Sequence, residues 1–273
     1  GPLGFWINYT SLEGKTKATI SSTAFNILEG WAHPSVAAAV SVTAADTGDD
    51  VLDIDRLLDS GGTLYLVAPA SDQDKFKAVF ETLINAVVMN VEHRAHRNGG
   101  KPINPPLLLA LDEAANIATP RRLDQIASKS ANEGICLLSV WQDEGQIETI
   151  YGRSRARSVV ANHFAKIYLP GIQDQQTLEN LSRAIGSDLF AFTSTTSGRD
   201  SSSTSTSYHE LPVAPTDQLR MLADDEAIVI VSNYPPIRAR LRGWFEDDEL
   251  RALVHPEIAR AYDQTFAPVK ATA

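Results

Sequence analysis

The chain has 273 residues, a net charge of −10 and 43% hydrophobic residues, a composition typical of globular proteins that excludes a disordered or fibrous chain. Cys136 is its single cysteine, which excludes an internal disulfide framework and a multi-cysteine zinc site. The acidic balance excludes a protein that coats nucleic acid over its whole surface, but it allows a local basic surface.

Apolar periodicity and turn residues predict helices and strands that alternate along the chain. The predicted helices cover residues 20–42, 53–60, 75–97, 123–132, 145–151, 153–162, 174–186 and 246–262, the last as one helix or two. The predicted strands cover residues 63–67, 106–111, 135–141, 165–169, 227–231 and 237–244. This order predicts an α/β domain with a parallel sheet flanked by helices.

Three segments carry more specific expectations. The apolar run 63–67 is expected to be a strand buried on both faces. The strand 237–244 alternates arginine with smaller or apolar residues after a Tyr-Pro-Pro turn, which predicts antiparallel pairing with its neighbour. Residues 194–208 are rich in Ser and Thr and have no apolar period, so we expect a mobile loop.

The clearest chemical signal is the apolar run 107–111 followed by Asp112-Glu113, the form of a Walker B strand. Ligands bind at the carboxyl ends of parallel strands, so both carboxylates would lie at a ligand-binding edge. Asp112 would hold the Mg²⁺ of a bound nucleotide, and Glu113 would orient or deprotonate the attacking water. The alternative is that one carboxylate caps the N-terminus of the next helix.

Gln142 follows the next strand and offers a neutral amide that can bond water or a γ-phosphate without adding repulsive charge. The alternative is a polar strand end that caps a helix. The phosphate-binding half of a nucleotide site is missing, because the partial match Gly14-Lys15-Thr16 has Tyr9 where a P-loop needs its first glycine. We expect these three residues to form an ordinary loop.

Several spaced motifs resemble the C-terminal half of the type IV secretion coupling proteins, the ring-forming DNA-translocase ATPases of bacterial conjugation. The matching stretches are Leu111–Ile117, Arg122–Ser128, Gly134–Ile135, Val140–Asp143, Asn162–His163, Leu169–Ile172, Asp225–Ala227 and Tyr234–Pro236. The resemblance implies a RecA-like P-loop ATPase core with an inserted all-α domain between the Walker A and Walker B regions.

On that basis, residues 5–45 are expected to be the end of the helical insert or the crossing back from it, and residues 46–273 the C-terminal part of the core without its Walker A segment. Residues 1–4, Gly-Pro-Leu-Gly, are typical of the remnant left by protease removal of an expression tag. We therefore expect a piece of a longer protein, with the Walker A strand and a membrane anchor upstream of Phe5.

The resemblance also implies a function. The whole protein would use ATP and Mg²⁺ to drive DNA, relaxosome or protein substrates into secretion-channel components, as a hexamer at the cytoplasmic face of the bacterial inner membrane. Asp112 would hold the metal, and Glu113 and Gln142 would act in catalysis. The piece alone is expected to be soluble, cytoplasmic, inactive, and monomeric or weakly associated.

Some family members place an arginine that acts across the subunit interface in the helix before Gly134, where this chain has Ala131. The nearby cations Arg121, Arg122 and Lys129 are candidates for that role. A solvated helix start is the alternative for the first two.

Two basic stretches are candidates for contact with DNA phosphates. Arg238, Arg240 and Arg242 share one strand face, whereas a spacing of two does not place residues 153, 155 and 157 on one helix face. An ordinary charged surface is the alternative for both. His163 has no second histidine at ligand spacing and is read as structural.

Two rival functions remain from the sequence. One is a non-catalytic docking module that recruits protein substrates through its helices and the 194–208 segment. The other is a double-stranded DNA translocase of the chromosome-segregation type, which shares the motor but not the secretion partner.

Overall fold

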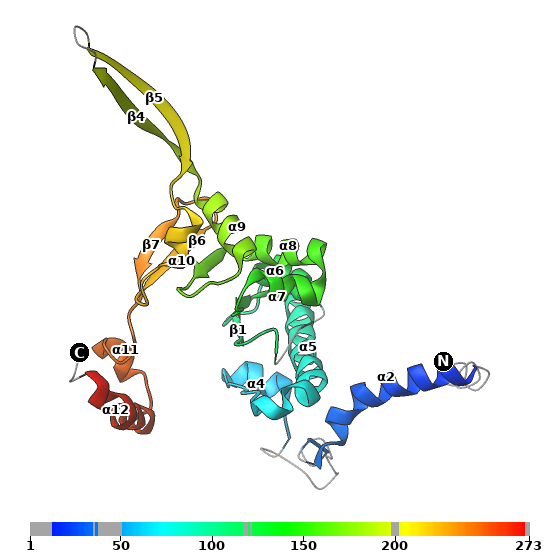
Figure 1. The fold of residues 1–273 in the computed structure, drawn as a ribbon. Coiled ribbons are helices and arrows are strands. Elements are labelled where there is room, and N and C mark those ends of the chain that lie inside the picture. Colours follow the sequence, from blue (N-terminus) through cyan, green and yellow to red (C-terminus); the bar gives the residue numbers. More distant parts are fainter. Residues whose placement is uncertain are drawn as a thin grey trace. The chain divides into compact units, whose positions relative to one another are not determined.

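A computed structural model describes residues 13–34, 36–37, 51–116, 120, 122–197 and 202–270. The chain divides into two compact units, Gly1–His163 and Phe164–Ala273 (Figure 1). Residues 1–4 and the boundary expected near residue 45 lie outside the described residues, so the expected domain limits remain predictions.

The first unit consists of helices around a short parallel strand pair. Its elements are α2 (Gly14–Ala32), α4 (Ile54–Ser60), a 3₁₀ turn (Ala70–Asp72), α5 (Gln73–Arg97), β1 (Leu107–Leu111), α6 (Leu123–Glu133), β2 (Ile135–Ser139), α7 (Glu144–Tyr151) and α8 (Arg153–Asn162). The polar residues that precede α4 and α7 are N-caps, as Asp53 accepts from Arg56 N at 3.1 Å and Asp143 accepts from Gln146 N at 2.8 Å.

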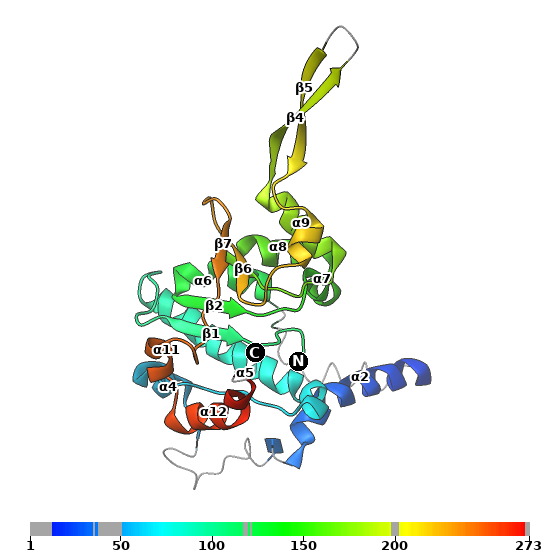
Figure 2. The same ribbon diagram turned by 60° about the vertical axis from the view of Figure 1, so that its left-hand side comes forward.

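Strands β1 and β2 lie side by side and point the same way (Figure 2), with Leu107 opposite Ile135 and Leu111 opposite Ser139. Val140 extends the pairing, because its N–H donates to Leu111 O at 2.9 Å and its carbonyl accepts from Ala114 N at 3.1 Å. The predicted parallel pairing is therefore confirmed, and it continues past the acidic residues that follow β1.

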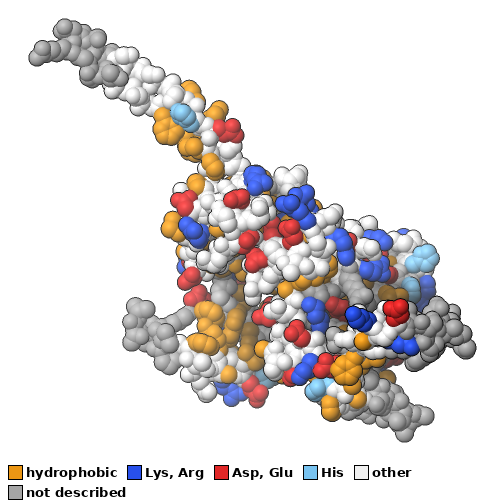
Figure 3. All heavy atoms as spheres, turned by 45° about the vertical axis from the view of Figure 1, so that its right-hand side comes forward, with side chains coloured by type: hydrophobic (Ala, Val, Ile, Leu, Met, Phe, Trp, Pro, Cys, Tyr) orange, Lys and Arg blue, Asp and Glu red, His pale blue; other side chains and the backbone are white. Residues whose placement is uncertain are grey.

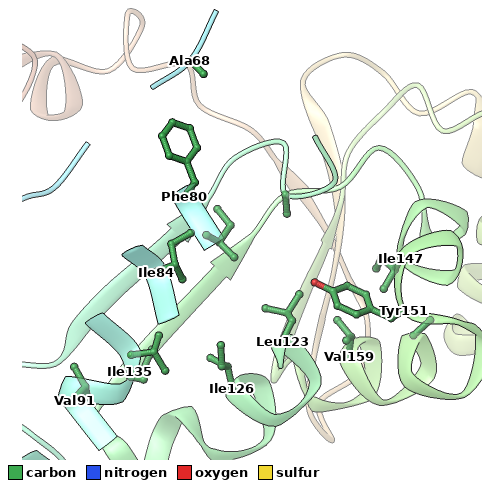
Figure 4. Packing of buried hydrophobic residues seen from close by; sticks show 14 residues of the cluster. Ala68, Phe80, Ile84, Val91, Leu123, Ile126, Ile135, Ile147, Tyr151 and Val159 are labelled. Carbon is green, nitrogen blue, oxygen red and sulfur yellow. The ribbon is translucent and has the colours of Figure 1, made fainter. Parts of the chain in front are cut away.

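The core of this unit packs on one face of the strand pair (Figure 4). Helix α5 contributes Phe80, Ile84 and Val91, and α6 contributes the fully buried Leu123. This core therefore supports one face of β1 and β2 and holds their carboxyl ends in place. On the opposite face, the Leu108 side chain is 63% exposed.

The second unit contains a three-stranded antiparallel sheet and a long hairpin. Its elements are β3 (Ala165–Tyr168), α9 (Gln175–Ile185), β4 (Ser187–Ser197), β5 (Ser202–Pro212), α10 (Thr216–Arg220), β6 (Glu226–Val231), β7 (Ile237–Arg240), α11 (Asp248–Ala252) and α12 (Pro256–Lys270). The sheet order is β3-β6-β7. The predicted antiparallel pairing of β6 with β7 is confirmed by Ala227 opposite Ala239. Strand β3 also pairs antiparallel with β6, with Ala165 opposite Val231, so this sheet departs from the expected parallel arrangement.

The 194–208 segment is not a loop. Its described residues lie in β4 and β5, two 11-residue strands that pair antiparallel from Ser187 opposite Pro212 to Ser197 opposite Ser202. The hairpin projects from the helices and sheet of its own unit (Figures 1 and 2). Residues 187–195 and 203–212 are exposed on both faces, so no apolar period marks them, while their threonines favour extended backbone.

Two further expectations are wrong. Residues 63–67 form no strand, and Tyr65 and Val67 are each 80% exposed, because no described strand bonds to this segment. Gly14-Lys15-Thr16 is the first turn of α2 rather than a loop. Tyr9 still departs from the P-loop pattern, so the motif match remains partial.

Candidate functional site

Asp112 and Glu113 form a tight exposed turn directly after β1. The backbone N–H of Glu113 donates to Asp112 Oδ1 at 3.1 Å, and that of Asn116 donates to Glu113 O at 2.9 Å. Glu113 has a φ of 47°, a left-handed conformation that non-glycine residues seldom adopt. Both carboxylates are solvent-accessible at the end of a supported strand, where they can meet a ligand.

Lys77 of α5 reaches this turn and was missed from the sequence. Its Nζ donates to Ala115 O at 3.1 Å, although the two residues are 38 positions apart in the sequence. Helical spacing placed Lys77 on α5, but no sequence pattern showed which turn it would contact.

Gln142 lies three residues after the end of β2 and is held by Gln146 on the first turn of α7. Gln146 Nε2 donates to Gln142 Oε1 at 3.1 Å, and Gln146 Oε1 accepts from the backbone N–H of Gln142 at 3.1 Å. The structure therefore places Asp112, Glu113 and Gln142 just beyond the carboxyl ends of adjacent parallel strands. Gln146 was also missed, since only the folded turn shows the pairing.

A hydrogen-bonded chain secures the end of β2. Trp141 Nε1 donates to Ser139 Oγ at 2.9 Å, and Ser139 Oγ lies 3.0 Å from His163 Nε2. His163 Nδ1 lies 2.7 Å from Val159 O, so this nitrogen carries the proton and Nε2 accepts from the Ser139 hydroxyl in the neutral ring. His163 thus supports the strand that leads to Gln142, which agrees with its structural interpretation.

Helices α6, α7 and α8 are fastened together near the site. Arg155 of α8 bonds both carboxylate oxygens of Asp124 on α6, at 2.6 and 3.3 Å, and this contact holds the pKa of Asp124 below its usual value. The buried Tyr151 hydroxyl donates to Pro120 O at 3.1 Å, and burial raises its pKa. These contacts hold the start of α6 against α7 and α8.

The three candidates for an interface cation differ in their surroundings. Arg122 donates to Gln125 Oε1 at 2.8 Å and lies 3.5 Å from Glu92 Oε1, so two contacts within the chain hold it. Lys129 is exposed on α6, and Arg121 lies outside the described residues. All three remain predictions.

The three arginines expected to face DNA each pair with a carboxylate. Arg238 lies 2.5 Å from Glu226, Arg240 lies 3.0 Å from Asp225, and Arg242 lies 2.5 Å from Asp247. Strand β7 ends at Arg240, so Arg242 lies beyond the predicted common face. These pairs offset the positive charge of the stretch, while DNA contact itself remains a prediction.

The residues present fit a metal that is shared with a nucleotide. In the described part of the chain no three His, Cys, Asp or Glu side chains gather into a metal cluster. Mg²⁺ at nucleotide sites is commonly held by one or two carboxylates, phosphates and water, and Asp112 offers such an accessible carboxylate. Among the described helices, none is both long and apolar enough to cross a membrane.

A family model described as type IV secretory system conjugative DNA transfer matches residues 7–266. The chain belongs to this family. It is 24% identical over 254 residues to the conjugal transfer protein TraG of Agrobacterium fabrum, covering 90% of this chain and 36% of that protein. It is 25% identical over 194 residues to the type IV secretion system-coupling protein VirD4 of Bartonella henselae, covering 69% of this chain and 29% of that protein. The chain thus spans about a third of these curated relatives.

Solved structures of the coupling protein TrwB share the fold. The unbound monoclinic form of TrwBdeltaN70 has a TM-score of 0.57 at 19% identity, over 71% of this chain and 44% of that one. The TrwB complex with ADP and Mg²⁺ has a TM-score of 0.55 at 20% identity, over 71% of this chain and 43% of that one. The expected family and RecA-like fold class are confirmed.

Proposed function

We propose that the chain supplies the metal-binding and water-activating half of an ATPase site in a conjugative coupling protein. The observation that carries this proposal is the placement of Asp112, Glu113 and Gln142 after two adjacent parallel strands of a coupling-protein fold. The whole protein would hydrolyse ATP to move DNA or a DNA–protein substrate into a type IV secretion channel.

Each residue has a distinct task in this proposal. Asp112 would hold Mg²⁺, which would offset the negative charge of the nucleotide phosphates. Glu113 would orient the attacking water and accept its proton, because its carboxylate is exposed at the strand end, where Asn116 Nδ2 donates to its Oε2 at 3.5 Å. Gln142 would bond the same water or the γ-phosphate through an amide whose orientation Gln146 sets.

The proposed assembly goes beyond this chain. Neighbouring subunits of a hexamer at the cytoplasmic face of the bacterial inner membrane would complete each site, and a Walker A segment outside the 273 residues would bind the phosphates. The chain alone is then expected to hydrolyse no ATP, whereas a version extended upstream hydrolyses it. Robust hydrolysis by the chain alone would contradict this division of the site.

Glu113→Gln in the intact coupling protein tests the central claim. We expect loss of ATP hydrolysis with nucleotide binding retained, because the amide keeps the side-chain shape and cannot take a proton. Glu148→Gln on α7 is the matched control, since that carboxylate is exposed and lies 3.6 Å from Arg153. Unchanged hydrolysis and unchanged DNA transfer in the Glu113 variant would favour a non-catalytic docking module instead.

A further inference from the structure

Lys77 is the side chain of α5 that bonds the backbone of the acidic turn. It is half-buried, and its Nζ donates to Ala115 O at 3.1 Å. The bond joins a long helix of the core to the residues that follow Glu113. A charged donor makes a stronger hydrogen bond to a carbonyl than a neutral one does.

The turn needs such support because Glu113 has a sparsely populated backbone conformation. Its φ of 47° is unfavourable for a residue with a Cβ, and such conformations persist only where the surroundings hold them. Ala114, which is 1% exposed, anchors the middle of the turn by donating to Val140 O at 3.1 Å. Asn116 N closes it on Glu113 O at 2.9 Å.

We propose that Lys77 is a positioning residue that keeps Glu113 aimed for catalysis by clamping the Ala115 carbonyl to α5. The inference rests on the proposed function, since it assigns Glu113 its catalytic task. Lys77 acts through the backbone: with the Ala115 carbonyl held, the turn keeps its shape, and Asn116 Nδ2 stays in place to donate to Glu113 Oε2 at 3.5 Å. Without the clamp, the turn relaxes toward commoner conformations and the carboxylate turns away.

A direct role of Lys77 as a phosphate ligand makes a different prediction. A ligand to phosphate contributes to nucleotide affinity, whereas a clamp on the turn changes the rate of hydrolysis with affinity preserved. The side chain uses one of its donors on a protein carbonyl, which points to the clamp.

The test compares Lys77→Met and Lys77→Arg in the intact coupling protein. For Lys77→Met we expect kcat to fall about tenfold, while nucleotide Kd stays within about twofold. Hydrogen exchange at the amides of residues 113–116 should rise about tenfold, because the turn loses one hydrogen bond of ordinary strength. Lys77→Arg, which keeps a charged donor, should restore at least half of kcat. Lys75→Met is the matched control, because Lys75 pairs with Asp72 at the helix start.

Unchanged exchange in Lys77→Met would overturn the proposal, and so would a tenfold loss of nucleotide affinity. Exchange is measured without hydrolysis, so it reports the clamp independently of the catalytic claim. Normal hydrolysis by Glu113→Gln would instead overturn the proposed function, which separates the two failures.

Discussion

Gln146 holds Gln142 at two points, its Nε2 on the Gln142 side-chain oxygen and its Oε1 on the Gln142 backbone N–H, both at 3.1 Å. A free glutamine amide can turn over and exchange donor for acceptor, whereas this arrangement fixes which atom faces outward. Asp143 caps α7 independently, so the pair can be broken without removing the helix start.

Breaking this pair by Gln146→Met should lower ATP hydrolysis of the intact coupling protein about three- to tenfold, because the Gln142 amide loses its fixed orientation. Steady-state hydrolysis with saturating nucleotide measures the effect. Thr149→Ala is the control, since the Thr149 hydroxyl donates to the Gly145 carbonyl within α7 at 2.9 Å. An unchanged rate in Gln146→Met would show that Gln142 needs no such fixing.

Gly134, which lies between α6 and β2, is expected not to tolerate a larger residue. It has a φ of 82°, and an added Cβ would lie 2.7 Å from both Ile103 N and Ile103 O. Gly134→Ala should therefore lower the free energy of unfolding by about 3 kcal/mol or more. Gly61, which has the same left-handed conformation with a φ of 65° and nothing within 4 Å of an added Cβ, is the control.

Urea unfolding of the chain measures both glycine variants. Gly61→Ala should cost about 1 kcal/mol, the strain of the left-handed backbone alone. Equal losses for the two variants would mean that the close approach of Ile103 contributes nothing.

The Asp124–Arg155 pair should give a pH-dependent contribution to stability. Arg155 lowers the pKa of Asp124 in the folded chain, so the stabilisation is present above the unfolded value of about 3.9 and disappears as pH falls through the lower folded pKa. Asp124→Asn should cost about 1 kcal/mol at neutral pH and progressively less in acid. Denaturant unfolding at several pH values measures this difference.

Glu148→Gln is the control for that series, because the Glu148–Arg153 pair is exposed and spans 3.6 Å. It should change stability little at any pH. A loss in Asp124→Asn that stays constant down to strongly acidic pH would point to packing at α6 rather than to the ion pair.

The outer part of the hairpin should be dispensable for folding of its unit. Figure 3 shows hydrophobic side chains on the half of the hairpin nearer the rest of its unit and few of them farther out, and Phe192 is 50% exposed. The buried core of the unit lies elsewhere, around Leu178, Leu181 and Ile228. Replacing residues 192–207 by Asn-Gly, which forms a tight turn between Ala191 and Tyr208, should change the free energy of unfolding by less than about 0.5 kcal/mol.

Circular dichroism during thermal unfolding of the shortened chain checks this expectation. A large drop in the melting temperature would show that the hairpin contributes to the core of the unit after all.

The sequence was sufficient where an element packs against a neighbour within the chain. Periodicity located α5 and α6, and the apolar runs located β1 and β2, because each buries a regular set of side chains. Residues 63–67 have the same apolar character, but a strand also needs a bonding partner, which the described residues do not supply. The prediction for residues 194–208 failed for the opposite reason, because β4 and β5 have bonding partners in each other but no buried face.

The site could be predicted in part. The apolar strands are followed closely by Asp112, Glu113 and Gln142. The order of the elements therefore predicted that these residues lie at one edge of the strand pair. Lys77 and Gln146 could not be found in this way, because each acts through a contact set by the folded turn: Lys77 with a backbone carbonyl and Gln146 with another amide.

The peptide groups on either side of the Val140 Cα join the two strand ends mechanically. The Val140 N–H donates to Leu111 O, before the acidic pair, and the Val140 carbonyl accepts from Ala114 N, after it. Val140 is therefore bonded to the backbone on both sides of Asp112 and Glu113. We expect a displacement of β2 to move the backbone at Glu113, and a displacement of the Glu113 turn to move the end of β2, because these bonds connect them. The Glu113 carboxylate, which we propose activates water, and the neighbouring Gln142 amide are therefore expected to shift together rather than independently.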